Sequence, residues 1–457
     1  MLINKLDNVE VDLSTGHKFA REDIKEGENI IKYGNPIGHA VADIKKGEQV
    51  HTHNMKTNLS GKIEYKYTPF EDTEHDSPYK GRTFMGYVRK DGSVAIRNEI
   101  WIVNTVGCVN KVSEELARLT GAHHFPHPFG CSQLGDDQSV TQKILCGMVN
   151  HPNAAGVLVL GLGCENNNIE VFKKVLGEYD PERVKFLNCQ EFEDDIAEGV
   201  RLINELKEYA AQFKRQPVPV SALKVGLKCG GSDGFSGITA NPLVGRFSDM
   251  LIDAGGTSVL TEVPEMFGAE HLLMARAESR EIFDKTVELI NNFKEYYDRH
   301  NQVIYENPSP GNKKGGITTL EEKSLGCVQK AGSRAVVDVL DYGDRLSKNG
   351  LNLLNGPGND IVAITNLMAA GAHIILFTTG RGTPVGAPVP TVKVSTNTAL
   401  AEKKTRWIDY NAGKILDGID CDEDFFEYVL SVAEGKETVN EKYGYREISI
   451  FKDGVVL

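Results

Sequence analysis

The sequence predicts a multi-domain α/β protein, in which a small all-β module precedes two α/β domains with mainly parallel sheets. Near the start, two similar segments each combine a turn with β-prone residues. Further on, apolar runs alternate with amphipathic helical segments in units of about 30 residues, which is typical of parallel sheets with helical crossovers. The length of 457 residues is sufficient for two or three domains.

Composition and charge narrow the function classes. Hydrophobic residues make up 40% of the chain and charged residues 25%, as in an ordinary globular protein. The net charge of −13 argues against nucleic acid or an anionic membrane surface as a partner, because both would repel the protein. The eight cysteines form no small secreted framework, and neither a signal peptide nor an apolar run of about 18 residues is evident. We therefore expect reduced thiols and a cytoplasmic location.

Residues 1–62 contain an internal echo that predicts a compact all-β module. Segment 23–28 (DIKEGE) returns with one change as segment 43–48 (DIKKGE), and β-prone residues follow both copies. His51 and His53 come after the second copy and would point to the same face of a strand, where both imidazoles could reach one metal ion. The alternative is that this pair of histidines binds no metal.

Residues 63–82 are charged, aromatic and aperiodic, and we interpret them as a linker to an α/β domain over residues 83–216. In an open parallel sheet, the carboxyl ends of the strands meet at one edge, and ligands bind there. Four cysteines lie next to glycine at predicted strand ends and could therefore line one crevice. The alternative is that they are small buried hydrophobic residues. The four are Cys108, Cys131, Cys164 and, in the next domain, Cys229.

The C-terminal domain, residues 221–457, opens with the segment that is richest in candidate chemistry. A buried strand at 223–227 and a helix at 243–254 flank the loop 228–242 (KCGGSDGFSGITANP). A strand, a glycine-rich turn and a helix bring backbone N–H groups and a helix N-terminus towards an anion. The alternative is a tight turn with glycines at positive φ. The side chains that could bind a substrate here belong to Cys229, Ser232 and Asp233.

Two later loops add basic residues. A region rich in glycine and lysine contains Lys313, Lys314 and Lys330, and it could cradle a carboxylate and a polyol. Arg381 lies between two glycines after a buried strand, where its guanidinium could bind a carboxylate through two hydrogen bonds. The alternative for the region rich in glycine and lysine is a solvated connector. The alternative for Arg381 is a structural ion pair. No P-loop, GxGxxG fingerprint or GxSxG elbow is present.

Taken together and in this order, the segments closely resemble the altronate/galactarate dehydratase family over nearly the whole chain. The first module resembles the SAF-type β-clip of that family, but it is shorter between Val11 and Gly16, as though an early hairpin were missing. The strongest matches are YGNPIGHAVADIKKGEQVHTHNMKTNLS, TVGCVN, GCSQLGDD, VLGLGCENN, KCGGSDGFSGITANP, LTEVPEMFGAE, YENPSPGNKKGGITTLEEKSLGC and FTTGRGTPVG.

The resemblance implies dehydration of D-altronate to 2-dehydro-3-deoxy-D-gluconate and water in hexuronate catabolism, by removal of the α proton and loss of the C3 hydroxyl. It also implies a divalent metal, iron(II) or in its place manganese(II). Alternatives within the family are a galactarate dehydratase or a sulfolactate-type lyase. From another class, the alternative is a sugar-acid-binding protein without catalysis. A homo-oligomer is compatible with the sequence.

The reaction requires stabilisation of an ene-diolate, a base at C2 and an acid for the departing hydroxyl. As metal ligands we expect His51, His53, Cys108, Cys131 and Cys164. As catalytic groups we expect Lys313, Lys330 and His53, with a lysine pKa lowered by burial or by neighbouring cations. As substrate-binding groups we expect Cys229, Ser232, Asp233, Lys314 and Arg381. An alternative cofactor is an iron–sulfur cluster on three thiolates, whose open iron would bind the leaving hydroxyl.

Overall fold

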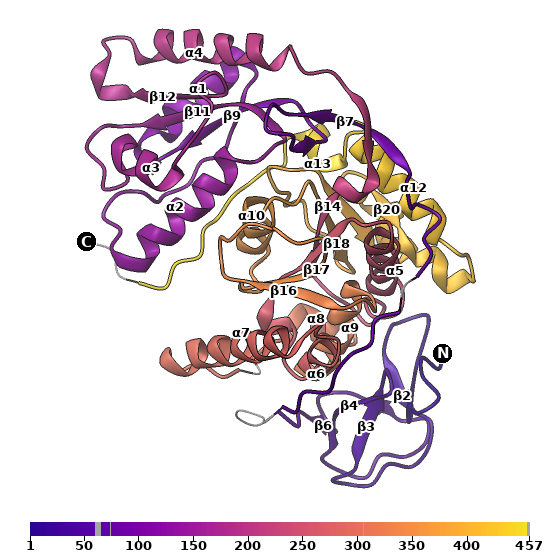
Figure 1. The fold of residues 1–457 in the computed structure, drawn as a ribbon. Helices are drawn as coiled ribbons and strands as arrows, with labels where there is room; N and C mark the ends of the chain where they lie inside the picture. The colour runs from indigo at the N-terminus through magenta and orange to yellow at the C-terminus, as the bar shows by residue number, and fades with distance from the viewer. Residues whose placement is uncertain (60–64, 74, 305, 455–457) are drawn as a thin grey trace.

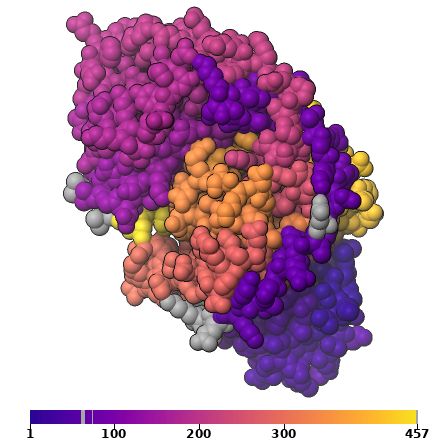
Figure 2. Space-filling model, viewed as in Figure 1, coloured from indigo at the N-terminus to yellow at the C-terminus, as the bar shows by residue number. Residues whose placement is uncertain are grey.

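The computed structural model describes residues 1–59, 65–73, 75–304 and 306–454, and it has three folded parts (Figure 1). An N-terminal β-module lies at one end, a second domain at the other, and a C-terminal domain between them. The space-filling view shows the module as a lobe against the C-terminal domain (Figure 2). The predicted fold class is therefore confirmed. None of the helices in these residues has the length and apolarity required to cross a membrane.

The N-terminal module consists of two antiparallel sheets whose echoed segments pair reciprocally. Lys25 of the first segment binds Asp43 of the second at 3.0 Å. In the same way, Lys45 of the second segment binds Asp23 of the first at 3.0 Å. A turn at residues 12–16 joins the first two strands directly. One sheet contains β1 (Val9–Val11), β2 (Lys18–Ala20) and β5 (Gln49–Val50), and the other contains β3 (Asn29–Lys32), β4 (Asn35–Ala40) and β6 (Met55–Lys56).

The second domain is a three-layer α/β/α sandwich. Its parallel sheet has the order β10 (His123–His124), β9 (Glu99–Asn104), β11 (Ala154–Gly161), β12 (Val184–Asn188). Helices α1 (Asn110–Thr120) and α4 (Asp195–Ala210) cover one face, and α2 (Gly135–Val149) and α3 (Ile169–Leu176) cover the other. Both faces of β11 are buried, as its continuous apolar sequence predicts. An antiparallel sheet of β13 (Gln216–Pro219), β7 (Thr83–Val88) and β8 (Val94–Ala95) lies where the chain enters and leaves this domain.

The C-terminal domain is built on a sheet of seven parallel strands. Their order is β16 (Val336–Leu340), β17 (Gly350–Leu354), β15 (Thr257–Leu260), β14 (Lys224–Cys229), β18 (Ile374–Thr379), β19 (Thr391–Ser395), β20 (Tyr410–Asn411). The helices around it are α5 (Ala240–Asp253), α6 (Glu270–Met274), α7 (Arg280–Arg299), α8 (Pro310–Lys314), α9 (Leu320–Cys327), α10 (Asp360–Ala369), α11 (Thr398–Lys403), α12 (Asp422–Ala433) and α13 (Val439–Tyr443). Helix α5 packs on one face of the sheet and α10 on the other.

The segment after β15 departs from its sequence pattern. Helical periodicity predicts one long helix ending near Tyr297, whereas the structure has the two helices α6 and α7. Between them, Ala277 forms a β-bridge with Val336. Ser279 then accepts a hydrogen bond from the Ile282 N–H and starts α7 as an N-cap. A tertiary contact therefore interrupts a pattern that is locally helical.

The second and C-terminal domains share a hydrophobic core. Ile144 on α2 belongs to the same cluster as Ile364 and Leu367 on α10. The two helices approach closely at Gly147, where a Cβ would lie only 2.8 Å from the Cβ of Ala369. Packed side chains, and not only the connecting chain, therefore hold these two domains together.

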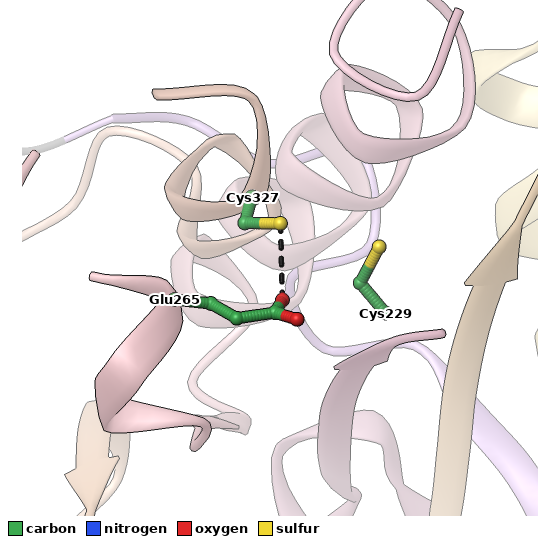
Figure 3. Close-up of side chains that lie close together, drawn as sticks. All are labelled: Cys229, Glu265 and Cys327. Carbon is green, nitrogen blue, oxygen red and sulfur yellow. Dashed lines mark hydrogen bonds between the residues drawn. The ribbon is translucent and has the colours of Figure 1, made fainter. Parts of the chain in front are cut away.

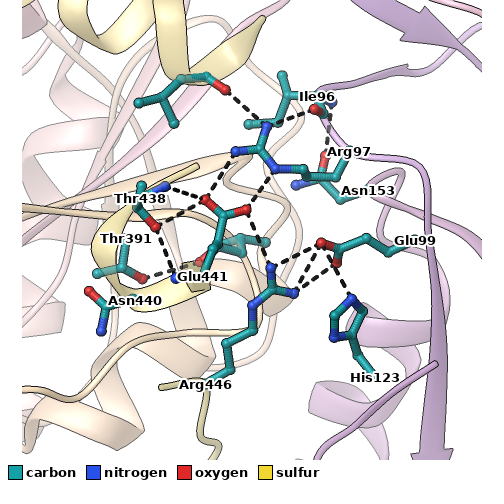
Figure 4. Close-up of polar contacts among 12 residues, drawn as sticks. Ile96, Arg97, Glu99, His123, Asn153, Thr391, Thr438, Asn440, Glu441 and Arg446 are labelled. Atoms are coloured by element: carbon teal, nitrogen blue, oxygen red, sulfur yellow. Dashed lines mark hydrogen bonds and ion pairs between the residues drawn. The ribbon is translucent and has the colours of Figure 1, made fainter. Parts of the chain in front are cut away.

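A buried network of charges also joins these domains (Figure 4). Glu441 accepts hydrogen bonds from Arg97 at 2.7 and 3.0 Å and from Arg446 at 3.3 Å. Arg446 in turn binds Glu99 at 3.0 Å. Burial alone would raise the pKa of Glu99, but the Arg446 guanidinium holds that pKa below its ordinary value. Each carboxylate is thus compensated by a guanidinium out of water, and this is the condition for a buried ion pair to be tolerated.

We expect the substitution Glu441→Gln to lower the free energy of unfolding by about 3 kcal/mol, because it leaves buried guanidinium groups without their counter-charge. Denaturant unfolding at neutral pH measures this effect. The matched control is Glu437→Gln, an exposed position in the same segment, where we expect a change within about 0.5 kcal/mol. Equal stability of the two variants would contradict the role assigned to this network.

Candidate active site

A pocket of about 580 Å³ lies at the carboxyl ends of three neighbouring strands of the seven-stranded sheet. Cys229 at the end of β14, Glu265 after β15 and Asp360 after β17 contribute to its walls. The chain order of the strands reverses at β14, since β15 and β17 lie to one side and β18 and β19 to the other. Ligands of open α/β sheets bind at such a switch point. The pocket is therefore the position at which this topology favours a functional site.

The loop after β14 is shaped for close approach of the backbone. Gly231 has φ +65°, and at Gly230 a Cβ would lie 2.5 Å from the ring of Phe377. Asp233, which the sequence predicts to bind substrate, instead contacts other residues of the protein. Its buried carboxylate accepts hydrogen bonds from Thr396 at 3.0 Å and Asn397 at 3.2 Å. These contacts fix the loop, and burial raises the pKa of the Asp233 carboxyl.

Two thiols and one carboxylate meet at the wall of the pocket (Figure 3). The ligand atoms of Cys229, Glu265 and Cys327 lie within 4.8 Å of one another, and all three residues are buried. The Cys327 thiol donates a hydrogen bond to Glu265 Oε2 at 3.1 Å, and Cys229 Sγ lies 2.7 Å from the Ser232 hydroxyl. Each residue ends its element: β14, the 3-10 helix η4 (Val263–Glu265) and α9. Thiolates and carboxylates together can hold a divalent transition metal.

Three buried lysines surround this group. Lys323 Nζ lies 2.8 Å from Glu265 Oε1, and Lys330 Nζ lies 3.8 Å from Glu262 Oε2. Lys228 binds both Glu262 and, at 2.9 Å, Asp360. Glu262 itself has φ +70°, a left-handed conformation that a non-glycine residue seldom adopts. The site thus combines closely paired charges with backbone strain, both common at functional sites.

The electrostatic environment sets the protonation of these groups. The neighbouring Cys327 thiol and the Lys330 ammonium lower the pKa of the Cys229 thiol to about 5, against the effect of burial. Burial would raise the pKa of Glu265, but the ammonium groups of Lys323, Lys228 and Lys330 bring it to about 2. A thiolate and a carboxylate are therefore present at neutral pH, as metal binding requires.

Lys330, one of the predicted catalytic lysines, lies beside this group with only 1% of its surface exposed. Burial alone would lower its pKa, as expected for a catalytic lysine. The negative charge that the sulfur atoms of Cys327 and Cys229 and the carboxylates of Glu262 and Glu265 place around it outweighs burial and raises the pKa of Lys330 above its ordinary value. The physical reason is that its neighbours are anionic, not cationic. In the structure Lys330 is therefore an ammonium group.

The remaining predicted substrate-binding and lysine positions lie around the pocket. Ser232 contacts Cys229, as described above. Lys313 and Lys314 are on α8, next to the pocket-lining residue Asn312. Arg381 is exposed, and its backbone N–H donates to the carbonyl of Gly231 at 3.0 Å.

The two predicted metal-binding histidines do not lie on one strand. His51 and His53 are in the turn between β5 and β6, so the same-face argument does not apply. The Nε2–H of His51 donates to the carbonyl of Lys313 at 3.0 Å, and burial lowers the pKa of His51. His53 is exposed. Neither residue lines the pocket.

The four cysteines predicted to line one crevice lie in two different domains. Cys229 belongs to the seven-stranded sheet, whereas Cys108, Cys131 and Cys164 follow strands of the second domain. The histidines belong to the N-terminal module and the three other cysteines to the second domain, and these two parts lie at opposite ends of the molecule (Figure 1). One ion cannot bind to all five residues. The position of a cysteine at the end of a predicted strand indicates that its thiol lies at the edge of a sheet, but it does not identify the sheet.

Six groups at or beside the pocket were not predicted as site residues: Lys228, Glu262, Glu265, Lys323, Cys327 and Asp360. A signal for two of them is present in the sequence. Glu265 follows the β-prone segment 258–263 (SVLTEV), much as Cys229 follows the buried strand at 223–227, and Cys327 stands next to a glycine like the four predicted cysteines. Lys323 carries no comparable signal, because its place depends on how α9 packs on η4.

Three family models match successive parts of the chain. Residues 3–58 match "Altronate/galactarate dehydratase SAF domain", residues 86–211 match "D-galactarate dehydratase/Altronate hydrolase, second domain", and residues 220–456 match "D-galactarate/Altronate dehydratase, C-terminal".

Full-length relatives are also similar. The chain is 54% identical to the altronate dehydratase of Bacillus subtilis, over 98% of this chain and 93% of that protein. It is 52% identical to the altronate dehydratase of Escherichia coli, over 99% of this chain and 94% of that protein. Identity to the galactarate dehydratase (L-threo-forming) of Escherichia coli is 33%, over 96% of this chain and 90% of that protein.

Proposed function

The chain belongs to the altronate/galactarate dehydratase family, and we propose that it is the hydro-lyase that converts D-altronate to 2-dehydro-3-deoxy-D-gluconate and water. The observation that carries this proposal is the greater identity to two altronate dehydratases than to a galactarate dehydratase. The alternatives of a galactarate dehydratase and of a non-catalytic binding protein are less well supported. A pocket containing a thiolate, carboxylates and ammonium groups suits chemistry on a polar acid.

We propose that Cys229, Glu265 and Cys327 hold the divalent metal of this enzyme. The donor set fits iron(II), because thiolate ligands favour a softer metal, whereas manganese(II) prefers oxygen ligands. The low pKa of Cys229 and Glu265 provides two deprotonated ligands, whereas Cys327, whose pKa is raised by its contact with Cys229 and by burial, must lose its proton on binding. When bound, the metal supplies Lewis-acid stabilisation to a substrate carboxylate.

Residues can be proposed for stabilising the ene-diolate, for binding the substrate and for the base at C2. The ammonium of Lys330 stabilises the negative charge that develops when C2 loses its proton. The Ser232 hydroxyl and the Lys323 ammonium position the substrate, and Arg381 and Lys314 at the rim recognise its carboxylate and hydroxyls. Lys313 and His53 stay the predictions for the base at C2.

We infer a cytoplasmic location, supported by eight cysteines that are all free in the structure. A sugar acid is the small-molecule partner. Self-association stays a prediction.

A substrate panel tests the proposal. Purified protein is loaded with iron(II) under anaerobic conditions and offered D-altronate, galactarate and sulfolactate in parallel. We expect rapid formation of a 2-keto acid from D-altronate and much slower conversion of the other two. A preference for galactarate would show that the protein is a galactarate dehydratase instead. Tight binding of D-altronate without any product would support the binding protein instead.

A further inference from the structure

Three exposed cysteines occupy equivalent positions in the second domain. Cys108 follows β9, Cys131 follows β10, and Cys164 follows β11. These are adjacent parallel strands, so the three thiols lie at the same edge of the sheet. The other five cysteines of the chain are buried or half-buried, and these three are exposed. Free cysteine is among the most often buried residue types, so three exposed thiols at one edge require an explanation.

Hydrogen bonds tie the three loops to one another. The Gly107 N–H donates to the Phe129 carbonyl at 2.9 Å, which joins the Cys108 loop to the Cys131 loop. The Asn167 N–H donates to the Gly130 carbonyl at 3.1 Å, which joins the Cys131 loop to the Cys164 loop. Each thiol is therefore within three residues of a bond to another loop.

The Cys131 and Cys164 loops are fixed by local contacts. Ser132 has φ +58°, a left-handed conformation that is costly for a non-glycine residue and persists only where surrounding structure holds it. Gly130 and Gly163, at φ +98° and +125°, adopt positive φ without that cost. Beside Cys164, the buried Glu165 carboxylate accepts hydrogen bonds from the Thr105 hydroxyl and the Gly163 N–H, both at 2.7 Å.

Each of the three loops leads directly into a helix: α1 begins two residues after Cys108, α2 four residues after Cys131, and α3 five residues after Cys164.

We propose that Cys108, Cys131 and Cys164 together bind one iron–sulfur cluster, with one thiolate on each of three irons. A single ion would need all its ligands close together. Within the described residues, the only group of three such ligand atoms within 4.8 Å of one another is the one at the pocket. The three thiols are therefore spaced too widely for one ion, and a cluster spreads its thiolate ligands over several irons. Its remaining iron has no cysteine and can take a hydroxyl or carboxylate. This site is separate from the pocket metal and does not depend on the proposed substrate.

The test uses the full chain, expressed with added iron and purified without oxygen. We expect a visible charge-transfer band and about four acid-labile sulfides per chain, as for a [4Fe–4S] cluster. The triple variant Cys108→Ser, Cys131→Ser, Cys164→Ser should lose both signals. The control variants Cys146→Ser and Cys189→Ser, half-buried positions of the same domain, should keep both.

Two further measurements keep the test decisive. A Cys229→Ser, Cys327→Ser variant should lose the iron bound at the pocket but keep the acid-labile sulfide of the cluster. This result would show that the two sites are separate. Single Cys→Ser variants at the three positions, checked by thermal unfolding, provide the answer if the triple variant does not fold. Absence of sulfide from the wild type after reconstitution with iron and sulfide would overturn the proposal. Stoichiometric zinc on the three thiols would overturn it as well.

Discussion

Replacing Glu265 with glutamine is expected to lower the rate of dehydration by about 10²–10³-fold, the scale of losing one preorganised electrostatic contact in an active site. Two effects combine. The substitution removes the one carboxylate of the proposed metal ligands, and it leaves the Lys323 ammonium, 2.8 Å away, without its counter-charge. The measurements are kcat on D-altronate and the iron retained after gel filtration, and both should fall together.

The matched control is Glu270→Gln, five residues further along the chain. Glu270 is also buried and also pairs with a lysine, Lys294 at 3.2 Å, but it does not line the pocket. We expect it to lose stability while the folded fraction keeps its rate and iron. Partial recovery of iron in Glu265→Asp would show that the carboxylate itself is needed. A well-folded Glu265→Gln with normal rate and iron would remove this residue from the site.

Much of the fold follows from local sequence signals, because apolar periodicity and turn residues act over short distances. The predicted strand at 223–227 corresponds to β14, and the predicted helix at 243–254 to α5. The echoed segments do form pseudosymmetric partners. Where a local pattern failed, a tertiary contact was the cause, as at Ala277 between α6 and α7.

The site could be predicted only in part, because its residues come together from distant positions in the chain. Cys229 and Ser232 belong to a glycine-rich loop that is conspicuous in the sequence. Their partners, Glu265 and Cys327, are 62 residues apart from each other. Strand order determines which loop ends become neighbours, and the sequence contains no direct record of that order. Because the sequence does not record strand order, the four cysteines were expected in one crevice although they belong to two different sheets.

The N-terminal module docks on the helix that serves the pocket. Lys18 and Lys32 of the module bind the two oxygens of Glu322 on α9 at 2.7 and 2.8 Å, and all three side chains are at most 1% exposed. The next residue along α9, Lys323, lines the pocket. The helix ends at Cys327. The position of the module and the geometry of the proposed metal ligands are therefore coupled through one short helix.

We expect Glu322→Gln to lower the free energy of unfolding by about 3–5 kcal/mol and to reduce activity, because two buried ammonium groups lose their counter-charge. The neighbouring substitution Glu321→Gln is the control. Glu321 is buried too, but its hydrogen bonds within the described residues come from neutral groups, among them the Thr57 hydroxyl and the Asn58 N–H, so about 1 kcal/mol is expected. Denaturant unfolding measures the stability of both variants, and the rate of 2-keto acid formation from D-altronate measures their activity.

Comparing the pH dependence of stability in the wild type and in Glu322→Gln shows whether the charge of Glu322 provides the stabilisation. Burial would raise the pKa of Glu322, but Lys18 and Lys32 bring it to about 2, from an ordinary 4.5. Between these values the unfolded chain binds the extra proton, so the stability that Glu322 provides is complete above pH 4.5 and is lost as the pH falls towards 2. Glutamine does not titrate, so the stability gap between wild type and Glu322→Gln should narrow over that window. A gap that is the same at pH 3 and at pH 7 would mean that shape, and not charge, holds the module on α9.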